Sequence, residues 1–273
     1  MASPTTSAGP VGPLFRAWRE RRRVSQLDLA LRAEISARHL SFVETGRSQP
    51  SRDMVLHLAE HLEIPLRERN ALLLAAGYAP AFHERPLGDP ALAQAREAIE
   101  RLLRAHEPYP AIAVDRHWNV VTANEAATSP MSSAAPELLQ PPINLLRLSL
   151  HPEGLAPRIL NLAEWRSHLL ARLGHQVDLT GDPVLVELLH ELRRYPVQGA
   201  DSPTIRAAPA VVIPMQFQSD VGTLNLMGTT MVFGTPLDIT LSELAIETFF
   251  PADEETAELL RRLAHERSGL SGT

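Results

Sequence analysis

Three serines set the strongest local constraint on how this chain can fold. Ser25, Ser36 and Ser51 each precede a short segment whose apolar residues recur at helical spacing. Serine is a favoured helix N-cap because its side chain accepts a hydrogen bond from a backbone N–H of the first turn. Asp28 stands three positions after the first of these serines, where a capping box places an acidic residue. Apolar spacing from Leu14 and Pro65 in a first turn indicate two more helices, so residues 14–78 are expected to form an all-helical domain of five short helices.

The second and third of these helices have the spacing of a helix-turn-helix. That motif needs a helix of about two turns, a turn of three or four residues and a second helix packed across the first. The apolar residues expected between the two helices are Leu27, Leu31, Ile35, Leu40 and Val43. The outward face of the second helix is then short, amphipathic and arginine-bearing, which suits insertion into the major groove of DNA.

The residues that carry a family resemblance here are Gln26, Leu29, Ala30, Ser36, Leu40, Val43, Glu44, Gly46, Arg47 and Pro50. At these positions the stretch resembles the Xre-type helix-turn-helix class, the phage-repressor-like DNA-binding domains. The resemblance implies a DNA-binding set of Gln26, Ser36, Ala37, Arg38, His39, Ser41 and Arg47. Within that set, Gln26 is expected at a phosphate, His39 and Arg47 at the DNA backbone, and Arg38 at a base edge, where it can contact guanine bidentately.

Charge is distributed unevenly along the chain. The first 80 residues hold 11 arginines and eight acidic residues, and the remainder holds 15 arginines and 24 acidic residues. A mildly basic N-terminal part fits double-stranded DNA as its partner, but the small excess predicts weak binding by one copy. We therefore expect a homodimer on a pseudo-palindromic operator. A helical protein–protein domain with solvated arginines is the alternative.

Residues 79–90 contain three prolines and a glycine and are expected to form a linker. After this linker the chain no longer consists of helical segments alone. Residues 91–265 begin with a helix at 91–106 and two short β-prone runs, pass through a helical stretch, and end with three further β-prone runs and a closing helix. This order predicts an α+β domain of about five mostly antiparallel strands with helices on one face. Residues 1–13, rich in Ser, Thr, Gly and Pro, are expected to be a disordered tail, and residues 266–273 a second tail.

The same region resembles a known ligand-binding domain. The residues that carry the resemblance are Trp118–Asn124, Asn144–Arg147, Trp165, Asp182, Pro183 and Phe249–Thr256. The first of these segments is similar to a PAS-domain strand, and the others resemble the MmyB-like (MltR-type) ligand-binding domain. The resemblance implies a PAS-like sheet, helices over it and a small hydrophobic effector, such as a fatty acid, between the layers. The expected ligand-binding residues are Trp118, Asn124, Met215, Phe217, Met227, Met231 and Phe233. Stripes of Met and Phe also form ordinary cores, so a domain without a cavity is the alternative.

Composition excludes several chemistries. The chain has no cysteine, and all 26 of its Lys and Arg residues are arginine. Thiolate zinc sites, cysteine nucleophiles, a P-loop lysine and a Ser–Lys dyad are therefore absent. His57, Glu60 and His61 spell an inverted zinc-protease motif, but a five-helix domain is too small for a peptidase cleft, so a metalloenzyme is the least favoured function. No catalytic set, metal site or cofactor is expected.

The sequence thus predicts a DNA-binding transcription regulator that is not an enzyme and that senses a small hydrophobic ligand. A ligand-independent DNA-binding scaffold with a structural dimerisation domain is the alternative. The longest uncharged run, residues 221–237, contains glycines and a proline, so no membrane helix is expected. The N-terminus lacks the features of a secretory signal, and we expect a cytoplasmic protein.

Overall fold

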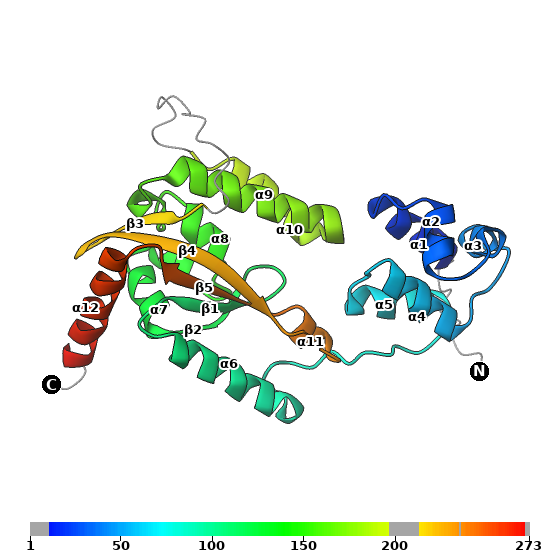
Figure 1. Ribbon diagram of the computed structural model, residues 1–273, viewed down its shortest axis with the longest axis horizontal. Helices are drawn as coiled ribbons and strands as arrows, with labels where there is room; N and C mark the ends of the chain where they lie inside the picture. The colour runs from blue at the N-terminus through cyan, green and yellow to red at the C-terminus, as the bar shows by residue number, and fades with distance from the viewer. Residues whose placement is uncertain (1–10, 197–212, 235, 271–273) are drawn as a thin grey trace. The chain divides into compact units, whose positions relative to one another are not determined.

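The computed structural model describes residues 11–196, 213–234 and 236–270 (Figure 1). The chain divides into two compact units. The N-terminal unit comprises the chain up to Arg85 with Asp178–Thr180 and Pro236–Ser242, and the C-terminal unit comprises the rest.

The N-terminal unit contains the five expected helices. They are α1 (Val11–Arg21), α2 (Gln26–Arg32), α3 (Ala37–Glu44), α4 (Arg52–His61) and α5 (Leu66–Ala75). The side chains of the three predicted capping serines accept hydrogen bonds from backbone N–H groups at the starts of α2, α3 and α4. The predicted caps are therefore confirmed.

Helix α1 begins three residues before the expected start at Leu14, and glycine is the reason that it can pack where it does. A Cβ on Gly12 would overlap the backbone carbonyl oxygens of Val43 and Glu44 at the end of α3. The missing side chain therefore allows α1 to approach the backbone of α3 closely.

The core of this unit includes Leu29, Ala30, Leu40 and Val43, all at most 1% exposed. Leu27 and Leu31 were expected in this core, but they are 60% and 68% exposed. The expectation was wrong because residues two positions apart lie on nearly opposite faces of a helix. With Leu29 and Ala30 facing inward, Leu27 and Leu31 face outward.

The C-terminal unit is built on a five-stranded sheet (Figure 1). Its strands are β1 (Ala111–Val114), β2 (Val120–Ala123), β3 (Met215–Ser219), β4 (Gly222–Val232) and β5 (Ala245–Pro251). They lie in the order β2-β1-β5-β4-β3, and every neighbouring pair is antiparallel. The expected PAS-like α+β fold with about five antiparallel strands is confirmed. The part of one predicted strand at residues 211–212 lies outside the described residues.

The remaining helices are α6 (Ala93–His106), α7 (Glu125–Met131), α8 (Leu145–Leu150), α9 (Leu162–Thr180), α10 (Pro183–Arg193), α11 (Ile239–Ser242) and α12 (Glu254–Leu270). Short 3-10 helices span Pro90–Leu92, Pro136–Leu139 and Ala156–Arg158.

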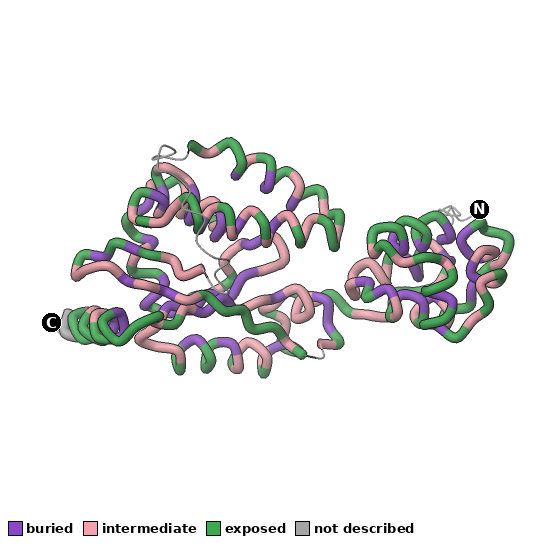
Figure 2. Tube along the Cα trace, turned by 45° about the horizontal axis from the view of Figure 1, so that its top comes forward, coloured by how far each residue is buried: buried purple, intermediate pink, exposed green. Residues whose placement is uncertain are grey.

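Helices cover both faces of the sheet, and not one face as expected. Ile99 and Leu103 of α6 pack with Ala111 and Ala113 on one face, while Ile112 joins a larger core formed with α7 to α10 on the other. Strand β1 is buried along its whole length, as expected for a strand with apolar residues on both sides (Figure 2).

Candidate functional site

One aromatic ring of α3 contacts two arginines, one on the outward face of α3 and one in the turn that follows it. Arg38 and Arg47 are exposed, and their guanidinium carbons lie 5.3 Å and 6.0 Å from the centre of the Phe42 ring. Cation–π contacts of this kind restrict where a long side chain can move. Phe42 therefore positions two cationic, donor-rich groups, one on α3 and one just after its C-terminal end. The sequence analysis did not predict these contacts. The signal for them is that Arg38 precedes Phe42 by four residues and Arg47 follows it by five.

A buried charge network supports the opposite face of α3. The Glu44 carboxylate accepts hydrogen bonds from Arg19 Nε at 2.6 Å and Nη2 at 3.0 Å, and from Gln26 Nε2 at 2.7 Å. The bond to Glu44 raises the pKa of Arg19 above its ordinary value. Gln26, predicted at a phosphate, is therefore held in place at the start of α2.

Part of the arginine run at residues 19–23 also forms hydrogen bonds within the domain and is not simply solvated. Arg22 Nε and Nη2 donate to the carbonyl oxygens of Leu62 and Glu63, at 2.9 Å and 3.0 Å. These carbonyls follow the end of α4, where backbone acceptors lack helical partners. Burial lowers the pKa of Arg22. Two members of the run thus stabilise the helical core, which charge patterning alone does not indicate.

The other predicted DNA-binding residues occupy the start and the flank of α3. Ser36 caps α3 by accepting from the backbone N–H of His39 at 3.1 Å. Ala37 is half-buried and packs against the core, and His39 and Ser41 are also half-buried. Arg38, Arg47 and Ser36 are thus the exposed members of the predicted set.

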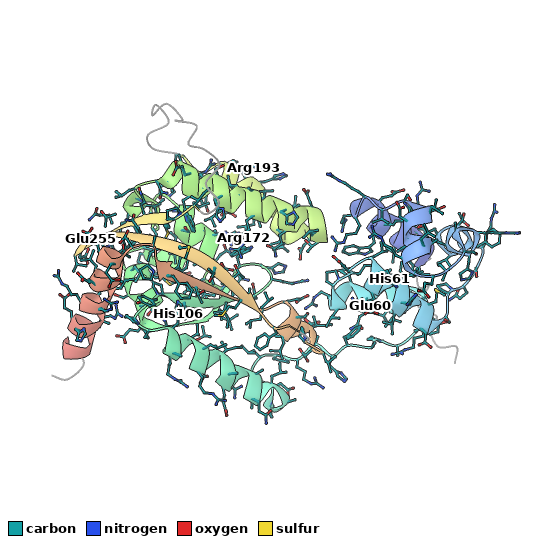
Figure 3. The ribbon with its side chains drawn as sticks, in the orientation of Figure 1. Glu60, His61, His106, Arg172, Arg193 and Glu255 are labelled. Carbon is teal, nitrogen blue, oxygen red and sulfur yellow. The ribbon has the colours of Figure 1, made fainter. Side chains whose placement is uncertain are left out.

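The zinc-protease-like motif lies on α4 and has packing roles. His57 Nε2 is 2.9 Å from the carbonyl oxygen of Ala33, and the His57 and His61 rings contact edge to face at 4.6 Å. Figure 3 shows Glu60 and His61 on this helix. In the part of the chain that the structure describes, no group of three potential ligands could hold a metal ion.

A cavity of about 690 Å³ lies within the C-terminal unit. Its wall comes from one face of the sheet and from α7, α8, α9 and α12. The apolar lining includes Ile112, Met131, Leu145, Leu146, Trp165, Leu169, Leu224, Leu226, Phe249, Leu260 and Leu263. This volume and lining are typical of small-molecule sites.

Three of the predicted ligand-binding residues line this cavity, namely Trp118, Met215 and Phe217. Met227, Met231 and Phe233 do not. Leu224 and Leu226 of β4 face the cavity, so the odd-numbered Met227 and Met231 point to the opposite side of the sheet. Phe233 follows the end of β4 and packs against the cluster under α6. The alternation on β4 was predicted, but the face of the strand was reversed.

Asn124, also expected at the ligand, has a different role. Its Oδ1 accepts from the backbone N–H groups of Ala111 and Ala127, at 3.0 Å and 3.1 Å. Its Nδ2 donates to the carbonyl oxygens of Tyr109 at 2.7 Å and Leu103 at 3.2 Å. The amide caps α7 and ties it to β1, so its hydrogen-bonding capacity is used within the fold.

Trp118 reaches the cavity because of an unusual backbone conformation. Its φ is 68°, in the left-handed region that a bulky residue rarely adopts. Asp115 supports the turn by accepting from the backbone N–H groups of His117 and Asn119, at 2.8 Å and 2.9 Å. The indole Nε1 donates to Gln176 at 2.8 Å. Trp118 therefore lies in the turn before β2 and not in the strand that the sequence predicts.

Charged and polar groups interrupt the apolar wall beside Trp118. Arg172 donates to both carboxylate oxygens of Glu247, at 2.8 Å and 2.7 Å, and its guanidinium carbon lies 4.6 Å from the centre of the Trp118 ring. Figure 3 shows Arg172 between α9 and the sheet. His168, one turn earlier on α9, also lines the cavity. Burial, and then the charge of Arg172, lower the pKa of His168.

These two units define a helix-turn-helix protein with a separate ligand-binding domain. The chain belongs to the MmyB-like transcription regulators: the family model described as the MmyB-like transcription regulator ligand binding domain matches residues 95–263, more than half of the chain. A helix-turn-helix domain model matches residues 11–72. The protein is thus a DNA-binding transcription regulator and not an enzyme, which confirms both predictions. The structure shows no helix in its described ranges with the length and apolar character that crossing a membrane requires.

No curated protein matches the chain. One solved structure, "Structure of an RNA-binding Light-Oxygen-Voltage Receptor", is similar with 15% sequence identity and a TM-score of 0.28. The match covers 96% of this chain, which spans 64% of the length of that one.

Proposed function

We propose that this regulator binds its operator sequence-specifically as a cytoplasmic homodimer and that its effector is a small hydrophobic molecule, such as a fatty acid. The DNA-binding domain is the one predicted at residues 14–78, extended to Val11 where α1 begins, and the ligand-binding and dimerisation domain is the one predicted at 91–265, extended to the end of α12 at Leu270; a linker at 79–90 joins them. The cavity of about 690 Å³ with its mainly apolar wall is the observation that carries the proposal of a hydrophobic effector.

The cavity favours a flexible, apolar guest. Met215, Phe217 and Leu226 contribute aliphatic and aromatic surface from two neighbouring strands, and Leu260 and Leu263 contribute it from α12. Burial of apolar ligand surface yields roughly 25 cal/mol for each Å² removed from water. An acyl chain supplies such surface and adapts its shape to an irregular wall. The alternative, a scaffold without a ligand, does not account for a cavity of this volume.

Sequence-specific DNA binding is supported by the exposed face of α3. Arg38 presents a planar set of donors that matches the O6 and N7 acceptors of guanine in the major groove. Arg47, held on the same Phe42 ring, suits a phosphate contact. One such domain carries a small positive excess, so two copies on the two halves of an operator increase affinity and set the half-site spacing.

Regulation then requires differential binding. An effector changes DNA affinity only if it binds one state of the dimer more tightly than another, and DNA changes effector affinity by the same factor. The sign of that coupling decides whether the effector releases the regulator from DNA or favours its binding.

The test combines ligand identification with a matched pair of cavity variants. Mass spectrometry identifies molecules that co-purify with the protein, and thermal unfolding with a panel of fatty acids and fatty alcohols measures their binding. Leu226→Trp fills the cavity and is expected to abolish the ligand-induced shift, whereas Met227→Trp, on the other face of β4, retains it. Circular dichroism confirms that both variants fold.

DNA binding is measured with and without the ligand that produces the largest shift. An operator affinity that is equal in both conditions refutes ligand control and supports the scaffold. Absence of any co-purified molecule and of any thermal shift refutes the hydrophobic effector itself.

A further inference from the structure

The two arginines that contact the Phe42 ring have guanidinium groups that the fold leaves available. Over the residues that the structure describes, neither Arg38 nor Arg47 forms an ion pair or a hydrogen bond through its side chain. In the same unit, Arg19 and Arg22 donate to a buried carboxylate and to backbone carbonyl oxygens. The donors of Arg38 and Arg47 can therefore bind acceptors on DNA without breaking a bond within the domain.

The turn after α3 closes on Phe42 and brings Arg47 back toward the helix. The carbonyl oxygen of Phe42 accepts hydrogen bonds from the backbone N–H groups of Arg47 at 2.8 Å and of Ser48 at 3.1 Å. Gly46 permits this turn, because its φ of 73° lies in the left-handed region that favours glycine. The backbone thus places Arg47 close to the ring before any side-chain contact forms.

Arg38 reaches the same ring from within the helix. It precedes Phe42 by four residues, a spacing at which two side chains meet on one face of a helix. The aromatic face attracts both guanidinium groups, although their like charges repel each other. An arginine loses rotamer freedom when it binds, so a contact that restricts its side chain beforehand reduces the cost of binding.

We propose that Phe42 is a positioning residue for DNA recognition: its ring fixes the guanidinium groups of Arg38 and Arg47 relative to each other, so that the base contact and the phosphate contact form together. This inference rests on the proposed DNA contacts of the two arginines and goes beyond them, because Phe42 lies outside the predicted DNA-binding set. Phe42 acts through the arginines, and loss of its ring has the same effect on base preference as partial loss of Arg38.

The experiment uses the full-length protein and the duplex that the wild type selects from random DNA. Arg38→Ala identifies the base pair that Arg38 reads, and fluorescence anisotropy measures dissociation constants for this duplex and for one with that base pair replaced. Phe42→Leu is expected to weaken binding of the selected duplex by about five- to twentyfold, because each exposed cation–π contact corresponds to a factor of about two to five. Preference for the base pair read by Arg38 is expected to fall by about two- to fivefold.

Two further variants separate positioning by the aromatic face from a packing role. Phe42→Tyr keeps the aromatic face and is expected to bind within about twofold of the wild type. In an Arg38→Ala background, Phe42→Leu is expected to cause no further loss of preference at that base pair, because the two residues act as one unit. Phe82→Leu, the same substitution at a half-buried residue outside α3, is expected to bind like the wild type. Thermal unfolding establishes that every variant is folded.

Three results overturn the inference. Equal affinity of the wild type and Phe42→Leu shows that the ring is not needed, and equal weakening in Phe42→Tyr and Phe42→Leu shows that its aromatic face is not what matters. Loss of preference at a different base pair, with the pair read by Arg38 unaffected, assigns the ring a direct base contact. If Arg38→Ala and Arg47→Ala both bind the selected duplex like the wild type, the proposed DNA contacts fail and the inference fails with them.

Discussion

Replacing Glu44 by Gln tests whether the buried charge network holds the two motif helices together. Glu44 lies at the end of α3, its side chain is 1% exposed, and it accepts two hydrogen bonds from Arg19 of α1 and one from Gln26 of α2. Gln has nearly the same volume but no charge and only one acceptor oxygen. The variant therefore leaves a guanidinium that is 10% exposed without its counter-charge.

The size of the effect follows from that arrangement. Removing one partner of a buried ion pair costs roughly 3–5 kcal/mol, because the remaining charge is uncompensated. A domain of this size has a total stability of about 5–15 kcal/mol, so a large part of it is lost. Because about 1.4 kcal/mol corresponds to a factor of ten, amide exchange limited by opening of this domain is expected to accelerate by a hundredfold or more.

Hydrogen exchange followed by mass spectrometry measures this opening in peptides covering residues 26–44, separately from the C-terminal unit. The control is Glu20→Gln, which changes an ion pair on the same helix α1 whose partners, Arg16 and Glu20, are 63% and 54% exposed. Solvent-exposed pairs of this kind contribute little, so the control is expected to exchange like the wild type. Equal protection in the Glu44→Gln and Glu20→Gln proteins would falsify the assigned role of the network.

Three further predictions follow from single positions. Arg38→Ala is expected to relax base preference at one operator position by about 1–3 kcal/mol, measured by selection from random DNA, whereas affinity for unrelated DNA falls only slightly; an unchanged selected sequence contradicts the base contact. Gly12→Ala is expected to destabilise the N-terminal unit by about 1–3 kcal/mol in urea unfolding, because the new methyl overlaps the backbone of α3. Gly174→Ala, with open space around it on α9, stabilises by about 0.5–1 kcal/mol, and a similar loss at both positions contradicts the packing argument. Asp182 is half-buried, and partial burial acts to raise its pKa, but the bond with His117 and its cap of α10 lower the pKa overall. Its stabilisation is thus present above the unfolded-state pKa of about 4 and is lost as pH falls, so Asp182→Asn is expected to flatten the acid side of the stability profile, and an unchanged profile contradicts this.

The sequence alone determined the local structure of the N-terminal unit. Ser25, Ser36 and Ser51 mark helix starts because N-capping depends only on a side chain and the next three backbone groups. Three of the five helices could be predicted for that reason, and apolar spacing from Leu14 and Pro65 at a first turn indicated the other two. In the C-terminal unit, period-two alternation and turn residues likewise identified the β-prone runs, and resemblance to a known family indicated that a ligand binds between the layers.

Only the tertiary structure decided which face of each helix or strand is buried or lines the cavity. Alternation along β4 is equally compatible with Leu226 or Met227 facing the cavity, because strand periodicity does not say which side is covered. Pairing with β3 and β5, and the helices above them, select Leu226. Leu27 and Leu31 faced outward for the same reason, since the phase of α2 is fixed by packing against α3. The ion pairs of Arg19 with Glu44 and of Arg172 with Glu247 join residues 25 and 75 positions apart, and such distant pairings arise only when the chain is folded.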